Sequence, residues 1–216
     1  MKKYTLFFCM VLFGFSVLAQ DNKGWKFSLG FDPMITWLSA KDDLKSDGSR
    51  LGFDFSLYAE NYFHNRYAFY IGLSYMNMGG KLKNNGNAPL SFNYFDLEQS
   101  ISTSLNAQYL SIPFGIKLHT AEFRLFSYYF NAGLYTGIRV GGSVRNPTSN
   151  EKCSISNDVN LITAGCQLGS GLMYAIADGT YLQTGLKFNY GFVDMLKTSK
   201  LNGQPLGVGL HIGILF

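Results

Sequence analysis

Eight segments of the chain place large apolar side chains at every second position. In the last of them, "PLGVGLHIGILF", Leu206, Val208 and Leu210 alternate with glycine and His211, and the run closes on Phe216. Side chains two apart in a strand share one face of a sheet, so this period predicts strands with one apolar face. The predicted strands cover residues 25–32, 51–60, 67–75, 110–118, 126–139, 162–172, 182–190 and 205–216.

The connections between these strands alternate in length. Residues 61–66, 119–122 and 176–179 are tight turns, whereas residues 39–50, 81–108, 141–160 and 195–204 form long polar stretches. Single-chain bacterial barrels have an even number of antiparallel strands, with short periplasmic turns and longer extracellular loops. We therefore predict an all-β fold, an eight-stranded antiparallel up-and-down transmembrane β-barrel with short periplasmic turns and long extracellular loops.

The first nineteen residues have the layout of a secretory signal. Lys2 and Lys3 precede an apolar run from 4 to 18, and the small residue Ala19 closes it. Such a charged, apolar and small-residue order is typical of a signal peptide that is removed on export. We expect residues 1–19 to be cleaved and residues 20–216 to form a single outer-membrane barrel domain. Beyond the signal, no window approaches the roughly twenty apolar residues that a transmembrane helix needs.

Composition and charge narrow the class of protein. The chain holds 24 Gly and is 16% aromatic but only 15% charged, a balance rich in strand and turn residues. Without Lys2 and Lys3 of the signal, the 18 basic side chains become 16, and the chain has 14 acidic ones. This near balance of charge does not favour a nucleic-acid partner. Two cysteines remain after the signal, too few for a disulfide framework. A bridge between Cys153, in a loop, and Cys166, on the lipid-facing side, stays an open question.

The main alternative for the fold is a soluble barrel of the lipocalin kind, which would turn its apolar face inward. The dense aromatic residues and the terminal Phe216 favour the membrane barrel instead. Trp and Tyr gather at both membrane interfaces. We expect an upper aromatic girdle of Trp37, Tyr75 and Tyr190 and a lower one of Tyr67, Tyr128 and Tyr181.

The polar face of the predicted barrel carries charges of both signs. Alternation places a luminal polar network inside the barrel: Lys26, Asp32, Asp54, Glu60, Lys117, Arg139, Gln183, Lys187 and His211. Asp32, Lys187 and His211 fall at similar depth on strands that become neighbours when the barrel closes, and Glu60, Lys26 and Lys117 gather near the bottom. Because an unpaired buried charge costs several kcal/mol, we expect these groups to pair as a structural plug. A proton or ligand relay is the alternative.

The size of the barrel argues against an open pore. Eight strands enclose a space that their own side chains can fill, and only much larger barrels leave an aqueous channel. We therefore expect a closed lumen.

Candidate chemistry is sparse. His64 and His119 fall in periplasmic turns and His211 lies inside the barrel, so none is placed beside a nucleophile near the outer leaflet, where a lipid-modifying enzyme would need one. The chain has no Cys-x-x-Cys, His-Glu-x-x-His or phosphate-loop motif. The acidic stretch 41–49 is too irregular for a calcium loop. We expect no catalytic residues, no metal and no cofactor, and therefore no enzyme.

Three stretches resemble a known family. "YLSIPFGIKL" (109–118), "LGSGLMYAIADGTYLQTGLKFNYG" (168–191) and the terminal "GLHIGILF" are similar to the PorT-like small outer-membrane barrels of Bacteroidota. The resemblance covers essentially the whole mature chain, and its motifs mark strands and turns. It implies an eight-stranded outer-membrane barrel, in a family named after a member linked to type IX secretion. The terminal Phe216 resembles the signal that the barrel-assembly machinery reads.

Pro113 stands inside the first of these motifs. Proline cannot donate to the sheet ladder, and a closed barrel offers no edge strand for it. We therefore predict a bulge or local irregularity at this position, either a family-specific register device or a bend that shapes the lumen.

The function expected from the sequence is structural. We expect an integral outer-membrane protein surrounded by outer-membrane lipid that displays loops 81–108 and 141–160 to an envelope protein complex, as an accessory subunit of secretion or transport. Loops on a rigid scaffold are where binding usually resides. A barrel that binds or transports a small apolar ligand is the second hypothesis, and an outer-membrane lipid-modifying enzyme is the third.

Overall fold

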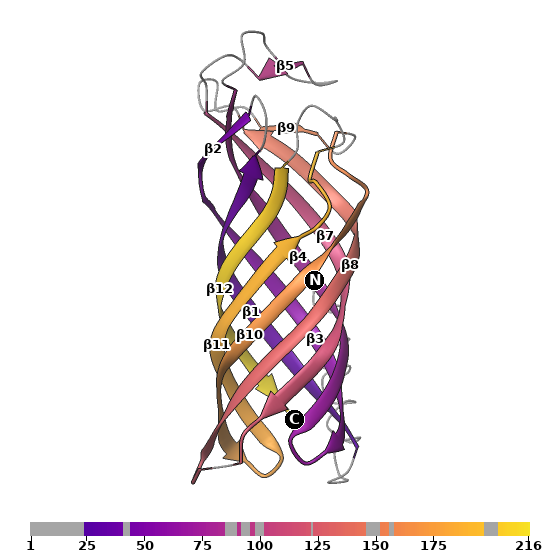
Figure 1. Ribbon diagram of the computed structural model, residues 1–216, viewed down its shortest axis with the longest axis vertical. Coiled ribbons are helices and arrows are strands. Elements are labelled where there is room, and N and C mark those ends of the chain that lie inside the picture. The colour runs from indigo at the N-terminus through magenta and orange to yellow at the C-terminus, as the bar shows by residue number, and fades with distance from the viewer. Residues whose placement is uncertain are drawn as a thin grey trace, which may run out of the picture.

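Eight long antiparallel strands close into a tall barrel in the described part of the chain (Figure 1). The computed structural model describes residues 24–40, 44–84, 90–91, 96–97, 102–121, 123–145, 152–155, 158–196 and 203–216, so the predicted signal, residues 1–19, lies outside them. The barrel strands are β1 (Trp25–Ala40), β3 (Arg50–His64), β4 (Tyr67–Asn84), β7 (Ser102–His119), β8 (Phe126–Arg145), β10 (Ile162–Ala177), β11 (Thr180–Gly191) and β12 (Gly203–Leu215). The described residues include no helix long and apolar enough to span a membrane.

Four short strands lie outside this cylinder: β2 (Leu44–Gly48), β5 (Leu90–Ser91), β6 (Asp96–Leu97) and β9 (Lys152–Ser154). β2 pairs with the upper end of β4, β9 with the upper end of β8, and β5 with β6. All four belong to the end of the barrel opposite the tight turns (Figure 1).

The barrel closes between its first and last strands. Register pairs such as Ser28 with Leu215 join β1 to β12. At the seam, Phe27 and Phe216 exchange two backbone hydrogen bonds of 2.8 Å, and their rings lie 6.5 Å apart. The C-terminal residue is therefore part of the closure, and the predicted barrel is confirmed.

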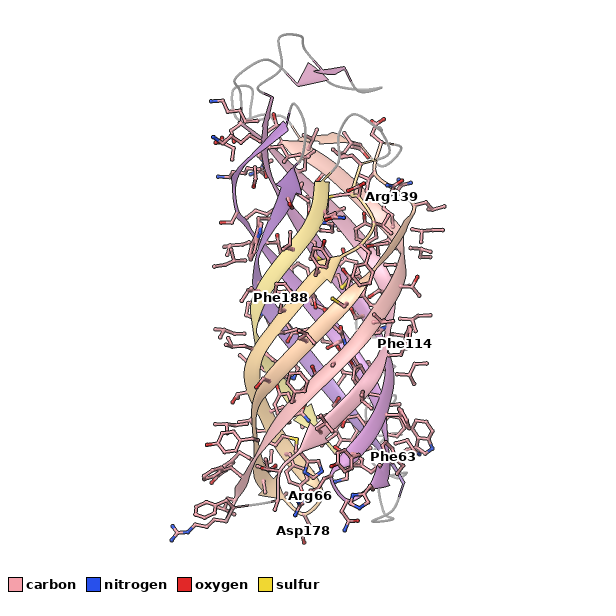
Figure 2. The ribbon with its side chains drawn as sticks, viewed as in Figure 1. Phe63, Arg66, Phe114, Arg139, Asp178 and Phe188 are labelled. Atoms are coloured by element: carbon pink, nitrogen blue, oxygen red, sulfur yellow. The ribbon has the colours of Figure 1, made fainter. Side chains whose placement is uncertain are left out.

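The short turns gather at one end, as predicted. Asn65 and Arg66 connect β3 to β4, and Asp178 and Gly179 connect β10 to β11. Figure 2 shows Arg66 and Asp178 at this lower end and Arg139 near the other. Gly179 takes φ 74°, a left-handed conformation that glycine adopts without steric cost in so tight a turn.

The outer face of the last strand is apolar, as its alternation predicts. Leu210 and Ile212 expose 58% and 51% of their surface outward, whereas Gly209 and Gly213 are buried inside. One aromatic residue departs from the prediction. Tyr181 does not join the lower girdle, because it shares the inward face of β11 with Gln183 and packs against the buried cluster of Tyr129, Met173 and Leu215.

The strands extend further than the sequence predicts at the loop end. β4 continues to Asn84, β7 begins at Ser102 and β8 continues to Arg145. The predicted loop 81–108 therefore begins and ends in strand, loop 141–160 begins in strand, and loop 39–50 contains β2. The physical reason is that the inner face turns apolar here, with Leu82 and Leu105 fully buried, while the outer face turns polar.

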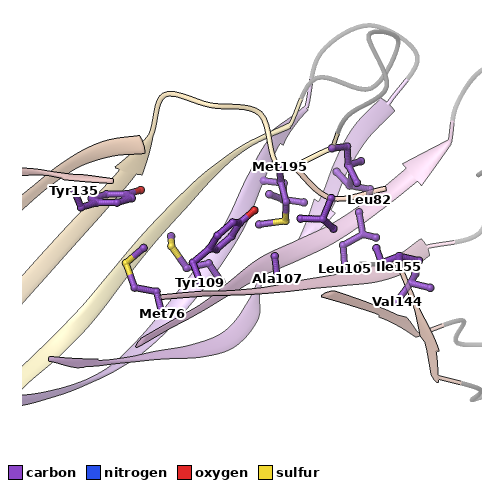
Figure 3. Close-up of a cluster of buried hydrophobic side chains, with 13 residues drawn as sticks. Met76, Leu82, Leu105, Ala107, Tyr109, Tyr135, Val144, Ile155 and Met195 are labelled. Carbon is purple, nitrogen blue, oxygen red and sulfur yellow. The ribbon is translucent and has the colours of Figure 1, made fainter. Parts of the chain in front are cut away.

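This upper lumen is filled by a hydrophobic core (Figure 3). Its members are Leu38, Met76, Met78, Leu82, Leu105, Ala107, Tyr109, Tyr135, Val144, Ile155, Val159, Met195 and Leu196. The last four come from connections that fold back over the barrel mouth. Backbone hydrogen bonds hold them there, from Ile155 to Gly142 at 3.2 Å and from Met195 to Gly203 at 2.8 Å. The described connections thus cap the barrel with apolar side chains.

Pro113 interrupts the sheet without a bulge. The β4–β7 ladder lacks pairs between Ile71 with Phe114 and Ser74 with Ser111, yet its register is the same on both sides of the gap. A register shift does occur in the β7–β8 pairing, between Gln108 and Tyr109. The predicted irregularity at Pro113 is therefore a gap in one ladder, and the register shift at Gln108 and Tyr109 is a separate feature.

A pair of facing glycines lets neighbouring strands approach inside the barrel. Gly115 of β7 and Gly133 of β8 are register partners. A Cβ atom at Gly133 would lie 2.2 Å from the Tyr70 hydroxyl and 2.4 Å from the Phe114 carbonyl oxygen. Since backbone cannot move aside as a flexible side chain can, neither position has room for a larger residue.

We predict that Gly133→Ala lowers the free energy of unfolding by about 1–3 kcal/mol through this overpacking. Urea unfolding of the barrel in lipid vesicles, followed by tryptophan fluorescence, measures the change. Gly203→Ala is the matched control, because a Cβ there first meets Leu38 at 3.9 Å, and its effect should stay within about 0.5 kcal/mol. Equal stabilities of the two variants would contradict the packing argument.

Candidate functional site: the luminal polar network

Four strands bring an ion cluster together in the middle of the lumen. The Lys187 ammonium of β11 donates to Asp32 Oδ2 of β1 at 2.8 Å and to Asp54 Oδ2 of β3 at 2.7 Å. His211 of β12 contacts the other Asp32 oxygen through Nδ1 at 2.5 Å. Two carboxylates therefore share one ammonium, and Asp32 has a second partner in the imidazole.

A second ion pair lies lower in the barrel. Lys117 of β7 donates to Glu60 Oε1 of β3 at 2.7 Å, and both side chains are only 3% exposed. Glu60 also accepts hydrogen bonds from the Ser28 hydroxyl at 3.2 Å and from the Tyr62 hydroxyl at 2.9 Å. Both carboxylate oxygens are thus occupied, which is what makes a buried charge tolerable.

Tyrosine rings surround both ion pairs. Tyr58 accepts a hydrogen bond from Lys187 at 3.2 Å and meets the Tyr70 ring edge-on at 5.4 Å. The Lys117 ammonium lies 5.4 Å from the centre of the Tyr129 ring, within the range of a cation–π contact. These rings fill the width of the barrel around the charges.

The space left between the two clusters is small. A cavity of about 20 Å³ lies between them, lined by polar side chains that include Glu60, Lys117, Gln183, Lys187 and His211. That volume holds about one water molecule. The arrangement can hold charges apart from lipid and seal the lumen, but the cavity has no room for a substrate.

The remaining predicted luminal residues take separate positions. Lys26 lies over the rings of Tyr181 and Tyr62, 4.9 and 5.5 Å from their centres. Gln183 lines the small cavity and contacts the Met173 sulfur at 3.6 Å. Arg139 does not reach the ion clusters, because it lies at the upper end of β8 (Figure 2) and donates to the Val159 carbonyl of the cap.

Several members of the network were not predicted from the sequence. Ser28, Tyr58, Tyr62 and Tyr70 contribute hydroxyl groups, and Gln167 donates to the Tyr70 hydroxyl at 2.9 Å. Strand alternation already placed Tyr58 and Tyr70 on the inner face. Tyrosine carries no charge at neutral pH, so a pattern of inward charges does not include these residues. A barrel of this width nevertheless needs large inward side chains to fill it.

No metal centre occurs in the described part of the chain, since it holds no group of three or more His, Cys, Asp or Glu side chains that could bind an ion. His119 lies at the end of the barrel that carries the tight turns, where its Nδ1 contacts the Thr120 carbonyl at 3.0 Å. Cys166 is a free thiol on the outward side of β10, and the Cys153 side chain lies outside the described residues.

Comparison with known families decides what kind of barrel this is. A family model described as "outer membrane protein beta-barrel domain" matches residues 11–197. The chain belongs to this family. An outer membrane protein beta-barrel domain resides in the bacterial outer membrane, so the apolar outer face described above meets lipid and the tight turns lie on the periplasmic side.

Solved structures of other outer-membrane barrels resemble this one in fold. Ail, the attachment invasion locus protein of Yersinia pestis, is 15% identical with a TM-score of 0.43, and the match covers 90% of this chain and 99% of Ail. Neisserial surface protein A is 17% identical with a TM-score of 0.48, covering 88% and 95%. OprG of Pseudomonas aeruginosa is 11% identical with a TM-score of 0.47, covering 91% and 97%. No curated protein matches the chain.

We predict that Lys187→Met destabilises this outer-membrane barrel by about 3–5 kcal/mol, because it leaves the Asp32 and Asp54 carboxylates buried without their shared ammonium. Urea unfolding in lipid vesicles measures the loss. Adding Asp54→Asn to this variant should restore part of the stability, since one of the unpaired charges is then removed.

The matched control for this prediction is Lys83→Met. Lys83 is a half-buried lysine near the upper end of β4, outside the four ion pairs of the described residues. Its replacement should change the free energy of unfolding by no more than about 0.5 kcal/mol. An unchanged unfolding midpoint for Lys187→Met would show that the buried ion cluster does not stabilise the barrel.

Proposed function

We propose that the protein is a PorT-like interaction component of the cell envelope, a closed outer-membrane barrel that serves as an accessory subunit of a secretion or transport complex. In this role the barrel conducts nothing and catalyses nothing. It anchors a rigid platform in the membrane and presents its connections to a partner. The motifs at 109–118 and 168–191 support the PorT-like assignment by resemblance.

The main support for this proposal is that both halves of the lumen are filled. The lower half holds the Glu60–Lys117 and Lys187–Asp32–Asp54 ion pairs, and the upper half holds the apolar core under its cap. A pore would need a continuous polar path through both halves. The described residues instead place salt bridges in one half and closely packed apolar side chains in the other.

The upper ends of the strands support an interaction role. The pairing of β4 with β7 continues up to Lys83 and Ser102, so the connection between them starts from a rigid pair of strands. A partner bound by regions 81–108 and 141–160 would meet a platform that the apolar core holds in place. Phe216, at the barrel seam, fits a second partnership, with the barrel-assembly machinery.

The alternatives have less support. A carrier of small apolar ligands would need a pocket of about 300–1,000 Å³, whereas the cavity within the lumen measures about 20 Å³ and is lined by charges. A lipid-modifying enzyme would need a base that lipid can reach. The Asp32 carboxylate beside His211 is fully buried inside the barrel, which argues against that use.

The decisive experiment is affinity capture of a tagged chain from crosslinked, detergent-solubilised outer membranes, with the co-purifying proteins identified. We expect envelope-complex subunits in stoichiometric amount, and their loss when residues 86–100 are replaced by a Gly-Ser linker of equal length. Arg66→Gln/Arg124→Gln, in the periplasmic turns, is the matched control and should keep any partner bound through the loops. Recovery of the barrel alone would contradict the proposal.

We also predict that the purified barrel gives no discrete conductance steps in a planar lipid bilayer, because the lumen is filled at both levels. A porin reconstituted under the same conditions provides the positive control. Reproducible single-channel steps from the folded barrel would refute the closed-lumen argument and favour transport.

A further inference from the structure

The outer wall of the barrel changes character along β4, β7 and β8. Register pairs define rows across these three strands on the face opposite the buried core. Tyr75, Leu110 and Ile138 form the last apolar row. The next row is Asn77, Gln108 and Gly141, and the one above it is Gly79, Asn106 and Ser143. Above Tyr75 the residues on this face are therefore polar or glycine, with Asn77 and Asn106 themselves buried and Val140 of β8 exposed beside them.

Cations follow these polar rows. Lys81, Ser104 and Arg145 form the next row, and Lys83 pairs with Ser102 above it. These residues face outward, because the alternate positions Leu82, Leu105 and Val144 are buried in the core. β2 adds Lys45 directly opposite Lys83.

The side chain of Arg50, on β3, lies near these cations on the outer face. A Cβ at Gly79 would lie 3.0 Å from Arg50 Cδ, and the guanidinium donates through Nη1 to the Leu105 carbonyl at 3.2 Å. Gly80 turns toward Leu38 of the core, so Gly79 and the Arg50 side chain across it lie on the outer face. Arg145 is near enough for its positive charge to oppose that of Arg50.

In the part of the chain that the structure describes, cations outnumber acidic side chains in this cationic patch of Lys45, Arg50, Lys81, Lys83 and Arg145. β4, β7 and β8 contain no Asp or Glu, and the four ion pairs of the described residues all lie in the lumen. Asp47 of β2 is the described acidic residue on the neighbouring strand. Lys45 opposite Lys83 is a like-charge pair, which is destabilising in a sheet. An external anion would relieve this repulsion.

The height of the patch identifies that anion. A strand rises about 3.3 Å per residue and is tilted by about 40° from the barrel axis. The stretch from Tyr67 to Tyr75 therefore spans about 20 Å along that axis, which is close to the height of the apolar band of a membrane barrel. Lys81 lies about 15 Å higher on the same estimate, and lysine and arginine side chains can reach back toward the interface. That level is the anionic sugar layer of the outer leaflet.

We propose that the cationic patch binds the phosphorylated sugar headgroup of the outer-leaflet glycolipid. The ammonium and guanidinium groups bind its phosphates. The half-buried hydroxyl groups of Ser104, in the Lys81 row, and of Ser143, in the row beneath it, hydrogen-bond its sugar hydroxyls. Binding fixes the barrel's height and rotation relative to its lipid neighbours, which is a role distinct from capture of a protein partner by the loops.

The test uses the purified full barrel in detergent, with diphosphoryl lipid A as the probe and native mass spectrometry as the readout. The triple variant Lys81→Gln/Lys83→Gln/Arg145→Gln removes three cations. Each cation near an anionic surface raises the affinity by roughly fivefold, so the affinity of the triple variant for diphosphoryl lipid A should be about 100-fold lower. Arg66→Gln/Arg124→Gln, at the exposed periplasmic turns, is the matched control and should leave affinity unchanged.

Two comparisons separate the lipid from other anions. Wild-type protein should bind dephosphorylated lipid A no better than the triple variant binds the phosphorylated form. Inorganic phosphate and the deacylated diphosphoryl disaccharide should compete weakly, and competition as strong as that of intact lipid would overturn the assignment to a membrane lipid. Heat-modifiable migration on gels shows that each variant is folded.

Salt provides a measurement without mutation. Wild-type affinity for diphosphoryl lipid A should fall steeply as sodium chloride rises, since exposed charges are screened within about 10 Å at 0.1 M. Equal affinity of wild type and triple variant, or an affinity insensitive to salt, would refute the proposal.

Discussion

The structure depends on the closure of its sheet. Within hydrocarbon no water is present to satisfy backbone amides and carbonyls, so strands can cross only when the last pairs with the first. The reciprocal 2.8 Å bonds between Phe27 and Phe216 complete that circle at its lower edge. Once closed, an eight-stranded sheet leaves an interior that must be filled, because neither lipid nor bulk water can occupy so narrow a space.

The interior is filled in two different ways along the barrel axis. Where lipid surrounds the barrel, the inner face carries charges, and Asp32, Asp54 and Lys187 are buried but paired. Above the last apolar row, water and headgroups surround the wall, and the inner face becomes an ordinary hydrophobic core around Met78 and Leu105. The polarity of the inside thus opposes that of the outside at both levels.

This reversal explains which parts of the structure could be predicted. Strand number, parity and the luminal positions of Lys187 and Glu60 follow from a constant alternation of apolar and polar residues. The segments 81–84 and 102–108 alternate in the opposite phase, with Leu82 and Leu105 inside, and so resemble polar loops. Contacts between specific side chains, such as Tyr62 with Glu60, depend on depth and rotamer, about which the period carries no information.

The reversal also gives the upper barrel a source of stability that the lower barrel lacks. In lipid, burying Leu or Met inside the wall gains little, because the surroundings are equally apolar. Above the membrane the same burial removes apolar surface from water and is favourable by about 25 cal/mol per Å². The core under Ile155 and Met195 is therefore what holds the strand ends together in water. An interaction platform outside the membrane needs such a core, whereas a passage for solutes would require its removal.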